Sequence, residues 1–247
     1  MRKNRQILRR KKMEQYSVSG SKAETGYEFL AKTYGWMFLA LVVSAACAYL
    51  AAYYEPLMRI IWGTKYVFYG LIIAEFALVI GLSAAIKTLP LSLATLFFLL
   101  YAAINGLTLS SIFLIYRTQS ICLAFFSTAL MFGLMSAYGA TTKKNLATAG
   151  HYLMMALIGL VIVTVVNRLI TFFTHTPLTW LDWLLSVASV IIFTGLTAYD
   201  AQKIAMIGSH DDGSDAYKKI SIYGALQLYL DFINIFLSLL RLFGKKR

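Results

Sequence analysis

Seven long apolar segments follow one another along this chain and leave it few choices of fold. They span residues 34–54, 67–86, 91–115, 121–140, 148–171, 181–200 and 221–243. Each is close to the roughly 20 residues that a helix needs to cross a bilayer, and none shows the alternation of a membrane β-strand. Only 14% of the 247 residues are charged, against about 25% in soluble domains. The sequence therefore predicts an all-α integral membrane protein with seven transmembrane helices.

The net charge of +12 is concentrated at the two ends of the chain. Residues 1–33 form a basic arm, residues 34–243 the predicted transmembrane domain, and residues 244–247 a basic tail. Basic clusters beside apolar spans are typical of topology signals and of contacts with anionic lipid headgroups. We therefore expect the lipid bilayer as a partner. Nucleic acid is not expected as a partner, because the arm is short and nothing beside it resembles a folded nucleic-acid-binding domain.

The distribution of basic residues also predicts an orientation. The positive-inside rule places the basic arm in the cytoplasm. Helix alternation then puts the lysine-containing loops on that side: Lys87, Lys143, Lys144, and the 201–220 loop. The tail breaks this pattern, so the last helix either spans against the rule or re-enters the membrane. The chain has no N-x-S/T acceptor, which favours a bacterial source, and we expect it in the bacterial inner membrane.

Three acidic residues lie where a bilayer disfavours charge. Asp200 ends the run VASVIIFTGLTAYD, Asp231 lies within GALQLYLDFINIFLSLL, and Glu75 lies within LIIAEFALVIGL. A carboxylate in a membrane span usually faces the bundle interior and marks an ion or proton path. These acids are therefore functional candidates; the alternative is that they only fix helix packing through hydrogen bonds.

Polar residues recur every three or four positions on the last predicted helix, which places them on one face. They are Gln227, Asp231, Asn234, Ser238 and Arg241. A helix with one polar side should lie inside the bundle, with little exposure to lipid. The preceding helix carries a similar stripe of Ser186, Ser189, Thr197 and Asp200.

Not every residue of these stripes is expected to serve an ion. The candidates for an ion path are Glu75, Gln227, Asn234 and Thr197. Asn105, Thr108, Ser186 and Ser189 are interpreted as hydrogen bonds between helices, which are typically weak in membranes.

If Asp200 and Asp231 are adjacent, the two carboxylates cannot easily ionise together. They would share one proton and titrate as a unit, which makes a pH sensor. A divalent cation could displace that proton. Since calcium prefers six to eight oxygen ligands, the two aspartates would form a weak transit site for calcium.

Signals of enzymatic chemistry are missing from the sequence. No G-x-S-x-G motif is present, and the three histidines (His151, His175 and His210) lie near the ends of the apolar segments. We therefore expect no enzymatic activity and no cofactor.

Four segments resemble the bacterial branch of the Bax inhibitor family, also called the transmembrane Bax inhibitor motif family. They are NGLTLSSIFLIY (105–116), MFGLMSAYGATTKKNL (131–146), FTGLTAYDAQKI (193–204) and LYLDFINIFLSLLRLFG (228–244). The resemblance covers most of the chain from about residue 27. It implies a seven-helix fold in which six helices surround a central C-terminal helix.

The resemblance also implies a pH-sensitive calcium leak gated by an aspartate pair, which maps onto Asp200 and Asp231. Glu75 resembles an acidic residue of the second helix that family members use in ion permeation. Calcium would then be the permeant ion and not a cofactor. An arginine that latches the pair in the family is absent here; the segment reads SAAIKTLP, so Lys87 is the candidate latch. Lysine lacks the planar fork that binds a carboxylate through two bonds.

A second function is compatible with the same residues. Other members of the family suppress cell death or regulate membrane proteolysis, both of which are stress responses. In that alternative the chain binds a membrane protein partner, the basic arm is a candidate contact, and the polar interior is structural.

Overall fold

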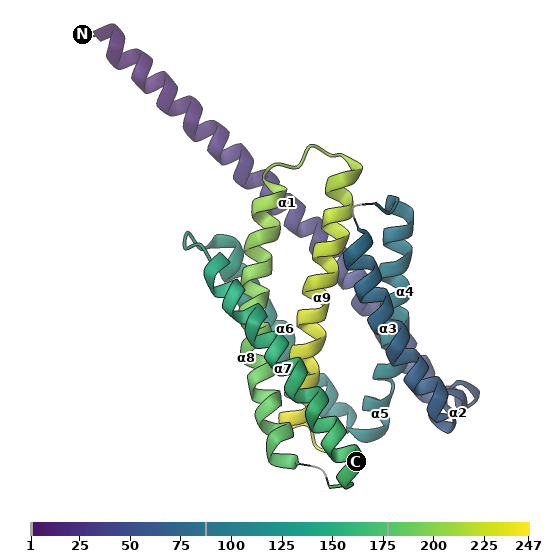
Figure 1. The fold of residues 1–247 in the computed structure, drawn as a ribbon. Helices are drawn as coiled ribbons and strands as arrows, with labels where there is room; N and C mark the ends of the chain where they lie inside the picture. The colour runs from purple at the N-terminus through teal and green to yellow at the C-terminus, as the bar shows by residue number, and fades with distance from the viewer. Residues whose placement is uncertain (1, 87, 177) are drawn as a thin grey trace.

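The computed structural model describes the backbone of residues 2–86, 88–176 and 178–247, and the side chains of residues 24–64, 66–86, 88–176 and 178–247. The backbone in these ranges is mainly helical (Figure 1). Its helices are α1 (Arg2–Tyr53), α2 (Glu55–Gly63), α3 (Lys65–Ala85), α4 (Leu91–Leu109), α5 (Ser111–Ile115), α6 (Thr118–Thr141), α7 (Ala147–Thr174), α8 (Thr179–Gly208) and α9 (Asp215–Phe243).

Seven segments of the described chain are helical, long and apolar enough to cross a membrane, so the predicted all-α integral membrane fold is confirmed. They are Glu24–Tyr53, Tyr66–Ala85, Leu91–Ile115, Thr118–Thr141, Ala147–Thr174, Thr179–Gly208 and Asp215–Phe243. Helices α4 and α5 together make the third span. The predicted boundary between arm and first span, at residue 33, falls inside α1.

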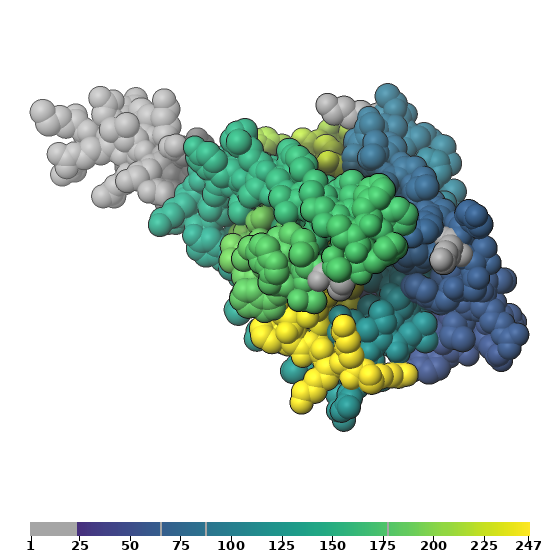
Figure 2. All heavy atoms as spheres, turned by 60° about the horizontal axis from the view of Figure 1, so that its bottom comes forward, coloured from purple at the N-terminus to yellow at the C-terminus, as the bar shows by residue number. Residues whose placement is uncertain are grey.

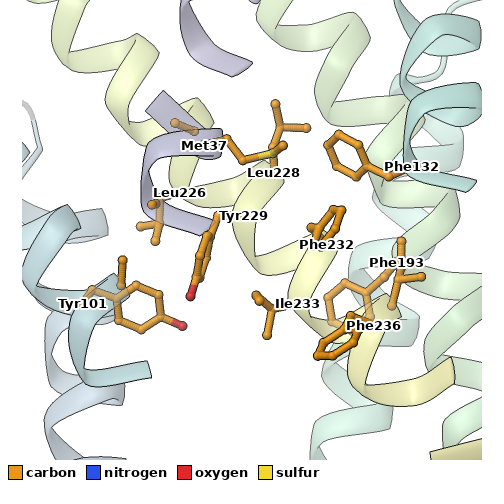
Figure 3. Close-up of a cluster of buried hydrophobic side chains, with 14 of the residues drawn as sticks. Met37, Tyr101, Phe132, Phe193, Leu226, Leu228, Tyr229, Phe232, Ile233 and Phe236 are labelled. Carbon is orange, nitrogen blue, oxygen red and sulfur yellow. The ribbon is translucent and has the colours of Figure 1, made fainter. Parts of the chain in front are cut away.

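The last helix, α9, is the centre of the bundle, as the sequence predicts. In its most apolar window 61% of the residues are buried, against 6% for α3 and for α7. Helices α1, α4, α6 and α8 pack around it. Figure 3 shows Met37, Tyr101, Phe132 and Phe193 from these four helices around the side chains of α9. The ring centroids of Tyr101 and Tyr229 are 5.8 Å apart, edge to face.

Helix α8 continues beyond the point where the hydropathy of the sequence falls. The sequence predicts that the sixth span ends at residue 200, whereas α8 ends at Gly208, and the prediction is wrong by two turns. The extension stays helical because it is amphipathic: Ala201 and Ile204 are buried, while Met206 is exposed. Asp200 therefore lies inside the helix and not at its end.

Helix α9 is unbroken, so the tail lies at the opposite end of the bundle from the loop 209–214 and from the N-terminus (Figure 1). We call these ends the C-terminal end and the loop end. The re-entrant alternative for the last helix is therefore wrong. The Arg117 amide donates to the Lys245 carbonyl at 3.1 Å, and the Arg247 amide donates to the Ile115 carbonyl at 3.0 Å. Figure 2 shows the tail, in yellow, beside the teal middle of the chain.

A close approach between α6 and α8 depends on one glycine. A Cβ atom at Gly139 would overlap the backbone carbonyl of Ala198. Small residues allow such backbone contacts between membrane helices, where dispersion and weak hydrogen bonds hold the helices together. Gly133 lies on the same helix and has open space at the corresponding position.

We expect Gly139→Ala to lower stability by about 1–3 kcal/mol, because the added methyl group must push α6 away from α8. Gly133→Ala should leave stability unchanged or raise it by up to about 1 kcal/mol, since alanine favours helix. Thermal unfolding of both variants in detergent measures the difference. Equal midpoints would contradict the close α6–α8 contact.

Candidate ion site

The structure brings Asp200 of α8 and Asp231 of α9 together in the interior. Their side chains belong to residues that are 6% and 3% exposed, and the two carboxyl groups interact electrostatically. Thr197 lies one turn before Asp200 on the same face of α8, and its side chain acts on the Asp231 carboxyl. The three residues therefore form one compact polar group, which we call the aspartate site.

The hydrogen bonds at the aspartate site are incomplete. Thr197 Oγ1 also lies 2.8 Å from the Phe193 carbonyl, to which it donates. Since a hydroxyl has one proton to give, Thr197 has none left for Asp231, whereas a proton on Asp231 would let that carboxyl donate to the Thr197 hydroxyl. The Oδ2 atom of Asp231 is buried and has no hydrogen-bond partner in the described part of the chain. An orphaned buried carboxylate oxygen is costly, and a proton or a cation would relieve that cost.

A basic side chain acts on Asp200 from the loop end. Lys203 lies one turn after Asp200 on α8 and interacts with its carboxyl electrostatically. The Lys203 ammonium also lies 5.7 Å from the centre of the Tyr199 ring. One lysine facing two buried acids leaves room for a further positive charge, either a proton or a metal ion.

Two cavities lie on either side of the aspartate site. The first, of about 440 Å³ at the loop end, is lined by residues that include Lys203 and Gln227. The second, of about 230 Å³ toward the C-terminal end, is lined by residues that include Phe193 and Asn234. Along α9, Gln227 precedes Asp231 by about 6 Å and Asn234 follows it by about 4.5 Å. The aspartate site therefore lies between the two cavities, with a polar residue of α9 in each.

Glu75 lies elsewhere. Its Oε2 accepts a hydrogen bond from Asn105 Nδ2 at 3.3 Å, and its Oε1 accepts one from Thr108 at 2.6 Å. The Tyr229 hydroxyl donates to Asn105 Oδ1 at 2.9 Å and lies 2.7 Å from the hydroxyl of Ser44. This network joins α1, α3, α4 and α9. Tyr229 and Asp231 project about 200° apart around α9, so Glu75 reaches the opposite face of that helix from the aspartate site.

The sequence did not single out Tyr229 or Ser44. A tyrosine within an apolar helix is an ordinary core residue, and both positions lie off the polar stripes used to find candidates. Ser189 is one of the two serines interpreted as interhelical contacts. It accepts a hydrogen bond from Ser238 Oγ at 2.9 Å, and this bond joins α9 to α8.

Two further expectations concern metal binding and the latch. Among the residues with described side chains, no group of three or more acidic, histidine or cysteine side chains gathers to hold a metal ion. The aspartate site contains two carboxyl groups and the Thr197 hydroxyl. Lys87, the candidate latch, lies outside the described residues.

We expect Tyr229→Phe to lower stability by about 1 kcal/mol, because the loss of its hydroxyl leaves Asn105 and Ser44 without a shared buried partner. Tyr152→Phe is the matched control, since Tyr152 is 66% exposed on α7. Thermal unfolding of the purified variants should separate the two. A Tyr229→Phe protein as stable as the control would show that the network contributes no net stability.

Comparison with known proteins places the chain in a family. Residues 27–247 match the family described as Inhibitor of apoptosis-promoting Bax1. The chain is 47% identical over 221 residues to the inner membrane protein YbhL of Escherichia coli, a match that covers 89% of this chain and 92% of that protein. A protein of Borreliella burgdorferi is 41% identical over 221 residues, covering 89% and 93% of the two chains. One of Deinococcus radiodurans is 36% identical over 233 residues, covering 94% and 97%. The chain therefore belongs to the Bax inhibitor family.

Proposed function

We propose that this protein is a pH-sensitive calcium leak of a bacterial inner membrane, gated by Asp200 and Asp231. The observation that carries the proposal is the burial of two interacting carboxyl groups between two cavities. Because the pair lies between the two cavities, it would close any path that joined them, and its charge would depend on pH.

The gate follows from the electrostatics of two close acids. With one proton on the pair, only one carboxyl group is charged, so the two do not repel each other and the aspartate site stays packed. Without it, two like charges face each other in a medium that screens them poorly. The protonated pair therefore holds one arrangement of α8 and α9, and deprotonation favours another.

Calcium would pass the aspartate site without being stored there. Two carboxyl groups and the Thr197 hydroxyl supply fewer oxygens than the six to eight that calcium prefers, so water must complete the shell. Gln227 and Asn234 offer amide oxygens in the two cavities. Glu75 lies on the opposite face of α9, so it would serve a separate part of the path, where it would have to exchange its bonds from Asn105 and Thr108 for the ion.

The proposed orientation places the N-terminus and the loop end in the cytoplasm. It is supported by the basic arm and by basic residues near the loop end. Lys143 lines a cavity together with Ser209, Lys203 lies near the end of α8, and Lys218 lies near the start of α9. The relative YbhL is named an inner membrane protein. The cavity beside Gln227 would then open toward the cytoplasm.

We expect calcium flux into dye-loaded liposomes to show one pH midpoint between about pH 5 and pH 8, because the pair titrates as a unit. Asp200→Asn and Asp231→Asn should each abolish the midpoint, and the double variant should show no further change. Asp215→Asn is the control: this acid of α9 is exposed and pairs with Lys218 at 2.9 Å.

Three results would overturn this proposal. Additive effects of the two substitutions would contradict a shared proton. A midpoint shifted equally by Asp215→Asn would point to general surface charge. Flux no greater than that of empty liposomes at every pH would remove the leak and favour the membrane regulator.

Deletion of residues 2–12 separates the two functions further. The deletion removes seven of the nine basic residues of the arm but leaves the aspartate site intact, so we expect calcium flux to be unchanged. A regulator that binds its partner through the arm should instead lose partner capture, as measured by affinity purification from membranes. Loss of flux on deletion, with the fold retained, would contradict a gate confined to the transmembrane domain.

A further inference from the structure

A second polar cluster lies at the C-terminal end of the bundle, where three helices bring charged residues to the smaller cavity. Arg168 lies near the end of α7, Asp182 in the first turn of α8, and Arg241 in the last turn of α9. All three side chains line the cavity of about 230 Å³. Their positions near helix ends place them at the depth of lipid headgroups.

The cluster has more positive than negative charge. Arg168 Nη2 lies 3.3 Å from Asp182 Oδ1, and Asn167 Nδ2 donates to the same oxygen at 2.8 Å. Arg241 interacts electrostatically with both Arg168 and Asp182, yet no ion pair within 4.0 Å joins it to a carboxylate in the described part of the chain. Two guanidinium groups thus face one carboxylate, which pairs with Arg168, and the three side chains together carry an excess positive charge.

Arg241 keeps much of its bonding capacity. Its Nε donates to the Leu237 carbonyl at 3.2 Å, and one Nη donates to the Ser238 hydroxyl at 3.4 Å. A guanidinium carries five N–H donors in a planar fork. The remaining donors can bind a second group, and the fork matches the geometry of a phosphate or carboxylate.

The cavity also has an apolar wall on its lipid-facing side, while Thr164, Ser189 and Asn234 add polar groups to its lining. Its walls include Phe76 of α3 and Leu157 and Val161 of α7. Phe76 is 63% exposed and Val161 is 49% exposed. Because α3 and α7 are the least buried spans, the cavity reaches the surface that the bilayer covers. A ligand of this cavity therefore meets both a cationic end and a hydrocarbon wall.

We propose that the cavity binds an anionic phospholipid, whose phosphate bridges Arg168 and Arg241 and whose acyl chain lies against Phe76 and Val161. The phosphate supplies the negative charge that the cluster lacks, and the chain extends from headgroup depth into the bilayer. Binding at this site does not depend on the proposed calcium leak, since it uses none of the residues of the aspartate site.

Binding of chain-labelled fluorescent phosphatidylglycerol to the purified full-length protein in neutral detergent tests the proposal. We expect Arg241→Gln and Arg168→Gln each to weaken binding about tenfold, the loss typical of one charge-assisted hydrogen bond. Arg241→Lys keeps the charge but not the fork and should give a smaller loss. Arg59→Gln is the control, because Arg59 is an exposed arginine of α2 paired with Glu55 at 2.5 Å. The affinity of this variant for phosphatidylglycerol should stay within about twofold of the wild-type value.

Further arms of the experiment distinguish the source of the anion. Labelled phosphatidylcholine should bind at least about tenfold more weakly, since its headgroup has no net negative charge. Val161→Trp should weaken phosphatidylglycerol binding, because the indole fills the apolar part of the cavity. Unlabelled phosphatidylglycerol should displace the probe, whereas inorganic phosphate at the same concentration should not.

Each opposite result overturns the site. Equal binding of the two lipids would remove the role of charge, and an equal loss in Arg59→Gln would indicate diffuse attraction to the surface. Displacement by inorganic phosphate as efficient as by lipid would identify a free-anion site. Unchanged affinity of Val161→Trp for phosphatidylglycerol would show that the lipid binds elsewhere. The same would follow if both arginine-to-glutamine variants kept the wild-type affinity and the wild-type melting temperature.

Discussion

A polar or charged side chain within a bilayer must find its partner inside the protein, because hydrocarbon offers none. This constraint bears most heavily on α9, which carries an amide, a carboxylate, a second amide, a hydroxyl and a guanidinium along one face. Helices α1, α4, α6 and α8 enclose α9 and keep this face away from lipid, and Ser238 donates a hydrogen bond to Ser189 of α8. The polar stripe therefore requires α9 to lie at the centre of the bundle, with the other helices packed around it.

The intramembrane acids satisfy this constraint in two ways. Glu75 receives hydrogen bonds at both of its oxygens, and the network continues through Asn105 to Tyr229. Asp231 keeps an unpartnered oxygen beside a second acid. A satisfied carboxylate holds helices in place, whereas an unsatisfied pair has something to gain from a proton or a cation. That contrast is the physical basis for assigning the gate to the aspartates and not to Glu75.

The proposed lipid site and the proposed ion path meet in one cavity. Asn234, on the path, lines the same space as Arg168 and Arg241. The two guanidinium groups carry more positive charge than one carboxylate cancels, so they would repel a calcium ion that reached this cavity. A phosphate held between the arginines would cancel much of that charge. Lipid composition at the C-terminal end would then bear on ion passage, although each proposal stands on its own observations.

Composition and periodicity were sufficient to predict seven spans, the three intramembrane acids and the polar face of α9, because each is a property of a single helix. The extension of α8 to Gly208 escaped this reasoning, since an amphipathic continuation lowers hydropathy without ending a helix. Only the tertiary structure decided that Asp200 meets Asp231 while Glu75 faces the other side of α9, and that Arg168, Asp182 and Arg241 share a cavity. These groupings depend on how helices far apart in sequence rotate and pack against one another. The periodicity within one helix does not determine which face of another helix it will contact.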